Sequence, residues 1–109
     1  MTTWKADIEG HQVLVEIHIV GWYHRWRLYV DGDFRDARDI YHDNDEYLRR
    51  NWHTLLRSSL TYRNGHKGVL EFQSKREGGW FSGPSRRFIL DGNEIAKWKR
   101  KSATWVLQP

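Results

Sequence analysis

The amino-acid sequence predicts an all-β fold, an antiparallel β-sandwich or a flattened barrel built from two pseudo-repeated three-stranded units. The first observation is a repeat: a basic, aromatic-rich segment that ends in Asp-Gly occupies 25–32 and returns sixty positions later at 85–92. The second is an alternation of apolar and polar residues with a period of two, which is typical of half-buried strands. Asp-Gly readily adopts the positive φ of a tight hairpin turn, so each copy of the repeat is predicted to be a strand that enters a turn.

The first unit, over 4–34, is predicted to hold three strands joined by short connections. Gly10 separates the first two strands as a hairpin turn, and 21–24 is predicted to be a loop. In the second strand the odd-numbered apolar residues, ending with Ile19, share the predicted inner face. The predicted strands of this unit are 4–9, 13–20 and 25–30.

The segment 33–46 interrupts the pattern. It carries six carboxylates and two arginines and lacks strand periodicity, so it is predicted to be a linker. Asp43 and Glu46 have the spacing of a capping box, and apolar residues follow at helical intervals. A short helix near 44–53 is therefore one expectation. An irregular crossover is the alternative, because a helix of about ten residues is marginal without packing.

The second unit, over 55–95, repeats the first. Asn64-Gly65 is a strong hairpin signal, a polar loop is predicted over 75–85, and a second Asp-Gly pair ends the third strand of the unit. The predicted strands are 56–62, 69–73 and 86–90, followed by a last strand over 104–107. Each unit has one apolar face that only the other unit can cover, so the chain is predicted to be a single domain over 1–109.

Composition narrows the class of protein. The chain of 109 residues has no cysteine and no apolar run long enough to span a membrane, which favours a cytoplasmic protein without disulfides or membrane contact. The net charge is +4, but residues 1–54 carry −3 and residues 55–109 carry +7. Such asymmetry suits either a solvated surface or a surface for nucleic acid or an acidic partner. Most of the seven tryptophans are predicted to lie in the core or to seal its edges.

No set of residues in the sequence predicts a reaction. The six histidines lack the spacings of metal ligands, and the acidic segment 39–45 lacks the glycine and the closing glutamate of a calcium loop. Phosphate-binding loops and nucleophile motifs do not occur. Asp31 and Asp91 could form a carboxylate pair across the repeat, but turn chemistry explains both residues more simply. We therefore expect a non-enzymatic protein that holds neither a metal ion nor a cofactor.

The repeated pattern resembles a known family, the Fas apoptotic inhibitory molecule family. The residues that carry the resemblance are Trp4, Gly10, 15–18 and 27–32 in the first unit, and 88–94 and 103–107 in the second. The resemblance covers nearly all of the chain as one such domain. It implies an all-β, non-enzymatic domain that acts through protein contacts, and it carries over no catalytic residues.

The segments that precede the two repeated strands carry large aromatic residues where polar residues would suffice. If these side chains are exposed, they are anchors of the kind that dominate protein interfaces, and if they are buried, they seal one end of the sandwich. We predict that they contact an unidentified protein partner. The candidate contact residues are Trp22, Tyr23, His24, Arg25, Trp80 and Phe81.

The alternative function is that of a single-stranded nucleic-acid-binding domain, which would use the basic C-terminal half. Cationic side chains would neutralise phosphates, and an aromatic ring would stack on an unpaired base. The residues that would carry this function are Arg86, Arg87, Lys97, Trp98, Lys99, Arg100 and Lys101. Protein contact is the preferred function, because basic residues alternate with core-type residues in 86–90, as on a solvated strand face.

Overall fold

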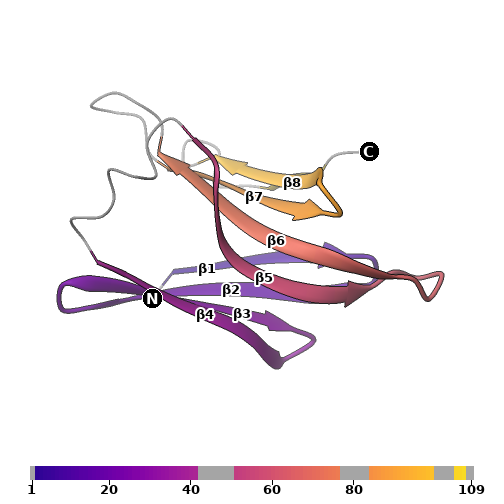
Figure 1. Ribbon diagram of the computed structural model, residues 1–109, viewed down its shortest axis with the longest axis horizontal. Coiled ribbons are helices and arrows are strands. Elements are labelled where there is room, and N and C mark those ends of the chain that lie inside the picture. The colour runs from indigo at the N-terminus through magenta and orange to yellow at the C-terminus, as the bar shows by residue number, and fades with distance from the viewer. Residues whose placement is uncertain (1, 42–50, 77–83, 100–104, 108–109) are drawn as a thin grey trace.

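The computed structural model describes residues 2–41, 51–76, 84–99 and 105–107 (Figure 1). These residues form nine strands. The strands are β1 (Thr2–Ile8), β2 (His11–Val20), β3 (Tyr23–Val30), β4 (Asp33–Tyr41), β5 (His53–Thr61), β6 (Lys67–Arg76), β7 (Pro84–Leu90), β8 (Asn93–Lys99) and β9 (Trp105–Leu107).

The strands form two antiparallel sheets that follow the order of the chain. Sheet 1 has the order β1-β2-β3-β4, and sheet 2 has the order β5-β6-β7-β8-β9. Figure 1 shows the two sheets as stacked layers. The predicted all-β fold is confirmed, and of its two forms the structure is the sandwich, because the sheets are separate.

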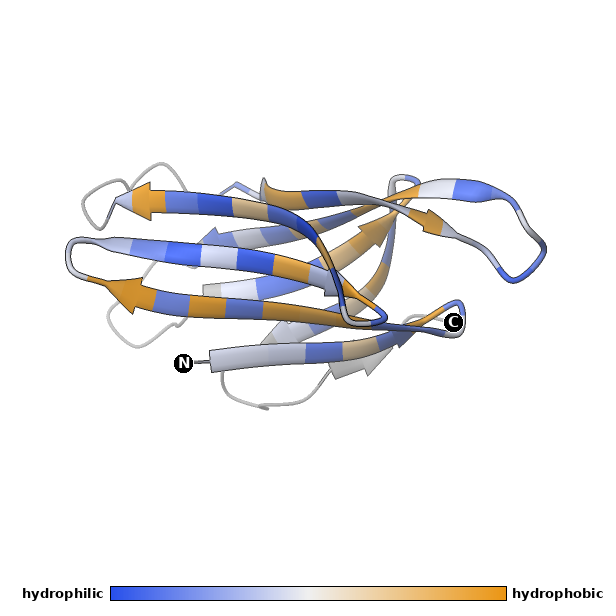
Figure 2. Ribbon diagram, turned by 90° about the horizontal axis from the view of Figure 1, so that it is seen from below, coloured by the Kyte–Doolittle hydropathy of each residue, from blue (hydrophilic) through white to orange (hydrophobic). Residues whose placement is uncertain are grey.

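The core lies between the inner faces of the two sheets. Figure 2 shows hydrophobic and hydrophilic residues in alternation along several strands, as expected for strands with one buried face. Full burial of a large apolar side chain contributes roughly 1.5–3 kcal/mol, so this layer supplies most of the stability. The buried apolar residues of sheet 1 are Trp4, Ala6, Ile8, Val13, Val15, Trp26, Leu28, Val30 and Ile40, and those of sheet 2 are Leu55, Leu56, Leu60, Leu70, Phe72, Phe88, Leu90 and Ala96.

Aromatic rings join the two sheets at the centre of this core. The Trp4 ring stacks on the Trp26 ring with centroids 5.6 Å apart and lies 5.9 Å from the Phe72 ring of sheet 2. Phe72 in turn contacts Phe88 at 5.3 Å, and Trp98 meets the edge of Trp4 at 5.7 Å. The expectation that tryptophans lie in the core is confirmed for Trp4 and Trp26, and Trp98 packs against the core while half-buried.

The sequence repeat corresponds to equivalent positions in the two sheets. β3 and β7 are each the third strand of their sheet, and each carries a register shift at the same point of the repeat, after Leu28 and after Phe88. Each strand then enters a turn in which Asp has a φ near 50° (Asp31 51°, Asp91 49°) and the following glycine has a φ of 82°. Two positive φ values in succession define the type I′ hairpin turn that Asp-Gly favours.

The two aspartates also tie each turn to the neighbouring strand. Asp31 Oδ1 accepts the backbone N–H of Gln12 at 2.9 Å, and Asp91 Oδ1 accepts the backbone N–H of Val69 at 2.8 Å. We call this arrangement the turn clamp. It explains why the repeat retains aspartate, whose side chain satisfies a backbone donor beside the turn.

The second carboxylate oxygen of each clamp has a different donor in the two sheets. Asp31 Oδ2 lies 2.5 Å from His11 Nδ1, whereas Asp91 Oδ2 accepts the Tyr62 hydroxyl at 2.6 Å. These bonds lower the pKa of both aspartates, and the bond to Asp91 raises the pKa of Tyr62 to about 12. Gly68 takes the position in sheet 2 that His11 takes in sheet 1, and its missing side chain leaves the room that Tyr62 uses.

Residues 33–41 correct the predicted linker over 33–46, because they form strand β4. β4 is an edge strand that pairs only with β3, and among its side chains only Ile40 is buried. A strand that buries so little needs no apolar alternation, which is why periodicity did not reveal it. Each predicted three-stranded unit therefore has a fourth strand, β4 or β8, while 42–46 lies outside the described residues.

The predicted helix over 44–53 falls mostly outside the described residues. Its end is wrong, because 51–52 are not helical and His53 begins β5. The predicted loop over 21–24 is shorter than expected, since Tyr23 already belongs to β3. In the parts of the chain that the structure describes, no helix is long and apolar enough to cross a membrane.

Side chains of β4 join the two sheets along one side of the sandwich. Asp36 Oδ2 accepts the backbone N–H of Arg57 at 2.8 Å, and Arg38 Nη1 donates to the backbone carbonyl of Thr54 at 2.9 Å. Both partners belong to β5, the edge strand of sheet 2. The two contacts satisfy backbone groups that an edge strand otherwise leaves open to a foreign strand.

Candidate functional site

The β2–β3 hairpin places a tryptophan at its tip. Val20 pairs with Tyr23 across a two-residue turn, in which Gly21 has a φ of 58°. Trp22, the second turn residue, is not among the residues with positive φ, and a positive φ at the first position alone is that of a type II′ hairpin turn, which glycine adopts without strain. Trp22 follows at the second turn position and is 82% exposed. Local sequence therefore positions this ring in solvent.

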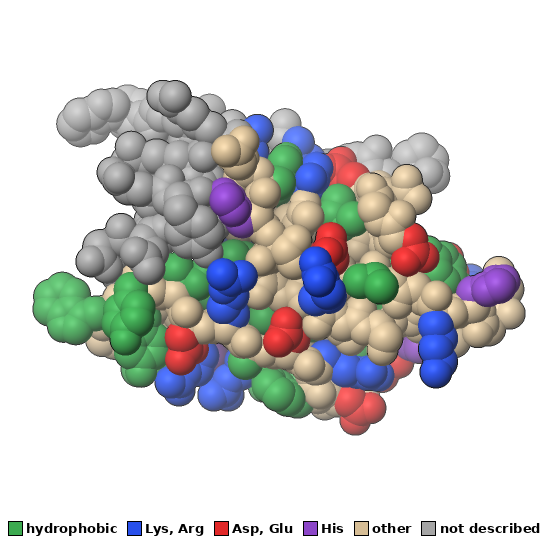
Figure 3. Space-filling view, viewed as in Figure 1, with side chains coloured by type: hydrophobic (Ala, Val, Ile, Leu, Met, Phe, Trp, Pro, Cys, Tyr) green, Lys and Arg blue, Asp and Glu red, His purple; other side chains and the backbone are tan. Residues whose placement is uncertain are grey.

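Other apolar and aromatic side chains lie at the same end of sheet 1. Ile19 is 72% exposed and Tyr41 is 58% exposed, and the Tyr23 ring meets the Tyr41 ring edge-on at 5.6 Å. Figure 3 shows hydrophobic side chains gathered at the end that carries the β2–β3 turn. We call Ile19, Val20, Trp22, Tyr23 and Tyr41 the tip patch. Val20, Tyr23 and Tyr41 lie on the outer face of sheet 1, Ile19 lies on the opposite face, and Trp22 lies at the turn. A group of exposed apolar residues at one end, unlike a single exposed residue, is typical of an interaction surface.

Ile19 lies on the same face of β2 as Val15 and Ile17, as predicted, but it is exposed. Val15 is fully buried and Ile17 is half-buried, so burial decreases along β2 toward the turn. The end of the hairpin thus extends beyond the area that sheet 2 covers. Alternation along a strand predicts which side a residue faces, but it does not predict whether anything covers that side.

His24 and Arg25, the remaining candidates on this hairpin, lie on opposite faces of β3. His24 is half-buried and is paired in register with Ile19. Arg25 Nε donates to Asp39 Oδ1 at 3.2 Å, Nη2 donates to the Tyr23 hydroxyl at 3.4 Å, and the guanidinium lies 5.6 Å from the Tyr23 ring centroid. The pKa of Arg25 is raised by its bond to Asp39. Arg25 therefore contacts Tyr23 of the tip patch and helps to hold its ring in place.

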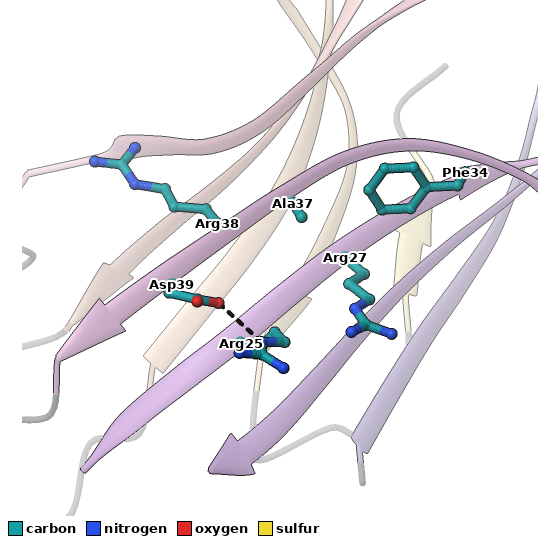
Figure 4. Close-up of a pocket in the computed structure, with 6 residues that line it drawn as sticks. All are labelled: Arg25, Arg27, Phe34, Ala37, Arg38 and Asp39. Atoms are coloured by element: carbon teal, nitrogen blue, oxygen red, sulfur yellow. Dashed lines mark hydrogen bonds and ion pairs between the residues drawn. The ribbon is translucent and has the colours of Figure 1, made fainter. Parts of the chain in front are cut away.

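A pocket of about 410 Å³ lies on the outer face of sheet 1, beside the tip patch (Figure 4). It is open to solvent and lies over β3 and β4. The pocket is deepest at Ala37, which is paired in register with Arg27, because alanine has a smaller side chain than the other residues that line it. The residues that line it are Arg25, Arg27, Phe34, Ala37, Arg38 and Asp39. We call this feature the outer groove.

Two candidate contact residues, Trp80 and Phe81, lie outside the described residues, as do Arg100 and Lys101 of the nucleic-acid alternative. Lys99 belongs to β8, where it is paired with Ser85.

Two further residues of the nucleic-acid alternative point toward the core. Arg86 is 8% exposed, and its guanidinium lies 5.1 Å from the Trp26 ring and 5.7 Å from the Trp4 ring. Trp98 packs its ring against Trp4. A buried guanidinium over two indole rings holds the sheets together and does not meet a ligand at the surface.

Arg87 and Lys97, two other cations of that alternative, lie beside Trp52, which sequence analysis did not propose as a binding residue. The Trp52 ring has Arg87 Cζ 4.1 Å from its centroid and has Lys75 Nζ and Lys97 Nζ each at 5.7 Å. We call these four residues the Trp52 platform. Arg87 is held in place by Gln73 Oε1, to which its Nε donates at 2.8 Å.

Sequence reasoning missed several members of both surfaces. Trp52 had been assigned to a helix, and Tyr41 and Phe34 belonged to a segment taken for a linker. The alternation of the predicted strand placed Arg27 on its polar face. Only the residues that line the pocket with it show that it belongs to a groove. The signal that could have found Tyr41 is the antiparallel register, which places it opposite Tyr23 once β4 is recognised.

The remaining tests of the site concern metal ions and known proteins. Within the described ranges, no three His, Asp or Glu side chains gather where they could hold a metal ion. The resemblance to the Fas apoptotic inhibitory molecule family stays a prediction. Comparison of the chain with family models, with curated proteins and with solved structures finds no match, so its function is inferred from the geometry of its surfaces.

Proposed function

We propose that this chain is a small, non-enzymatic binding module that docks a protein partner through the tip patch. The observation that carries the proposal is the 82% exposure of Trp22 on a short, conformationally defined turn. Tryptophan is enriched among the residues that dominate binding energy in protein interfaces. The expected cytoplasmic location stays a prediction.

The shape of the hairpin supports this function. Trp22 makes no contribution to the core, so its large apolar surface gains nothing from folding. The neighbouring Tyr23 and Tyr41 rings pack against each other and add two rigid side chains, which lose little conformational entropy on binding. A patch that does not stabilise the fold is available to stabilise a complex.

The test compares Trp22→Ser with a matched control, Val69→Ser. Val69 is also an exposed apolar residue, at 46%, but it lies on sheet 2 away from the tip. Proteins that bind the immobilised wild-type chain in an extract of its source cells are identified, and the affinity of each purified partner is then measured by calorimetry. Loss of a central tryptophan should weaken binding about 30-fold or more, whereas Val69→Ser should leave it unchanged.

Thermal unfolding of both variants is the folding control. Identical partners and affinities for the wild type and for Trp22→Ser would contradict the proposal. Sedimentation of the wild type, but not of Trp22→Ser, with lipid vesicles would assign the tip to a lipid surface instead.

A second candidate function is single-stranded nucleic-acid binding at the Trp52 platform. The observation in its favour is the presence of three cations within 6 Å of one indole ring. Such a group could neutralise phosphates beside a ring on which a base stacks. It ranks second, because Arg87 already covers Trp52 and bonds to Gln73.

A salt titration of oligonucleotide binding tests this second function. For three phosphate contacts on a single strand, a fourfold rise in salt concentration should weaken binding about twentyfold. Lys97→Gln should weaken binding and flatten this dependence, whereas Lys5→Gln, on sheet 1, should do neither. Absence of binding at low salt would eliminate the candidate.

A further inference from the structure

The outer groove continues the tip patch along the same face of sheet 1. Because alternate residues of a strand share a face, one row on β3 and one row on β4 run side by side from the tip into the groove. The outward residues, in order from the tip, are Tyr23, Arg25 and Arg27 on β3, and Tyr41, Asp39 and Ala37 on β4. A ligand anchored on the tip patch and extended along the sheet would therefore enter the groove.

The three arginines of the groove have different partners. Arg25 is paired with Asp39, and Arg38 points to the other side of β4, where it donates to the carbonyl of Thr54 (Figure 4). Arg27 forms no hydrogen bond or ion pair with any other described residue. The groove therefore holds one arginine that forms no ion pair with a carboxylate of the described residues.

The neighbouring strand does not supply the missing carboxylate. Glu16 on β2 is paired in register with Arg27, but its Oε2 lies 3.5 Å from His18 Nε2. An arginine with a free guanidinium presents a planar fork of donors that matches a carboxylate in bidentate geometry. The chemistry that fits Arg27 is thus an anionic oxygen pair.

Apolar side chains lie at both ends of the groove that holds Arg27. Phe34 is 58% exposed at one end of the groove and packs edge-on against Tyr29, Ala37 forms the low floor, and the tip patch lies at the other end. Arg27 and Tyr23 are four residues apart on one strand, a span of about 13 Å. An extended peptide covers the same span in about four residues.

We infer that the outer groove binds an extended acidic segment of the protein partner, with one carboxylate on Arg27 and a large apolar side chain about four residues away on the tip patch. This inference rests on the proposed docking at the tip and adds the chemistry of the partner. A nucleic acid fits less well, because phosphate binding relies on several cations. Here Arg25 and Arg38 already bond to Asp39 and to the Thr54 carbonyl, and exposed aromatic rings lie at both ends of the groove.

The experiment is an NMR titration of the isotope-labelled chain with two synthetic peptides. The first carries Glu and, four residues later, Trp in an otherwise Ser-rich sequence with blocked ends, and the second has Gln in place of Glu. Arg27→Gln tests the proposed contact. Arg63→Gln is the matched control, because Arg63 is 77% exposed in the β5–β6 turn at the opposite end of the molecule (Figure 1).

The acidic peptide should shift the backbone amides of Arg27 and Ala37 and the indole N–H of Trp22. Its dissociation constant should be about three- to tenfold lower than that of the Gln peptide, the effect of one charge-assisted contact at a partly exposed site. Arg27→Gln should remove this difference between the peptides, and Arg63→Gln should retain it.

Equal affinity for the two peptides, or no shift at the groove, would overturn the inference. If Trp22→Ser still weakens binding of the partner identified through the tip patch, the proposed docking stands. Only the inference of an acidic segment in the outer groove is then wrong. A single-stranded oligonucleotide that shifts the groove amides in place of the peptide would also overturn the assignment to a carboxylate.

Discussion

Gly68→Ala tests whether the turn clamp of sheet 2 depends on the empty position beside it. A Cβ atom built at Gly68 would lie 2.5 Å from Tyr62 Cε2 and 2.6 Å from Asp91 Oδ2. Non-bonded carbon atoms meet at about 3.5–4.0 Å, so the methyl group must displace the Tyr62 ring and break its bond to Asp91. Gly68 is not among the glycines with positive φ, so the expected strain is steric and not a strain of the backbone.

The magnitude follows from two opposing effects. Overpacking costs about 1–3 kcal/mol, and alanine in place of glycine recovers about 0.4–1 kcal/mol by restricting the unfolded chain. We therefore expect Gly68→Ala to lower the free energy of unfolding by up to about 2.6 kcal/mol. With an unfolding entropy of about 0.23 kcal/mol/K for a chain of this size, the melting temperature should fall by up to about 11 °C.

A double-mutant cycle with Tyr62→Ala isolates the steric contact. Without the ring, the clash with Tyr62 Cε2 is absent, although Asp91 stays bonded to the Val69 N–H and its Oδ2 remains close to the new methyl group. Gly68→Ala should therefore cost less than it does in the wild type. The assay is urea unfolding followed by circular dichroism for the wild type, the two single variants and the double variant. Equal effects of Gly68→Ala in the two backgrounds would refute the reasoning.

Three further predictions concern the other clamp, the core and the tip. His11 has its two ring nitrogens against acceptors, the Asp31 carboxylate and a backbone carbonyl of β5, and these bonds raise its pKa although Arg35 opposes them. The stability that His11 contributes should therefore be complete below pH 6.5 and should be lost as the pH rises through the raised pKa. In urea unfolding, the free energies of the wild type and of His11→Gln should differ more at pH 5.5 than at pH 8.5. An equal difference at both pH values would argue against the clamp. Phe72→Ala, at a fully buried ring in contact with both sheets, should cost about 3–5 kcal/mol in the same assay, and a cost below about 1 kcal/mol would show that the aromatic centre is not tightly packed. Trp22→Ser should change the unfolding free energy by less than about 0.5 kcal/mol, and a larger loss in the same assay would assign the ring to the fold and not to a partner.

Local physics made the fold class predictable from the sequence. An Asp-Gly pair adopts its turn because of its own backbone preferences, and alternation of apolar residues follows from the geometry of a single strand. The turns at Asp31 and Asp91 therefore lie where expected, with nearly identical φ values. The hairpin tip was also a candidate from sequence, because the segment that precedes the first repeated strand carries large aromatic residues where polar residues would suffice.

Tertiary structure decided which of these residues a ligand can meet. Arg86 and Arg87 are neighbours with the same charge, yet Arg86 is buried over Trp4 and Trp26 while Arg87 covers Trp52 outside the core. Alternation along β7 separates the two side chains, but which side becomes the interior depends on where sheet 1 lies. No property of 86–90 alone contains that information.

The same reason accounts for β4 and for the outer groove. β4 pairs with the free edge of β3, and Ile40 is the one buried side chain of β4, so the segment shows no apolar alternation in its sequence. The groove exists because Ala37 stands opposite Arg27 in the register of that pairing. The sequence by itself determined the strands and turns that depend on neighbouring residues. The exposure of side chains and their grouping into surfaces depend on contacts between segments far apart in the chain. Only the packing of the two sheets establishes those contacts.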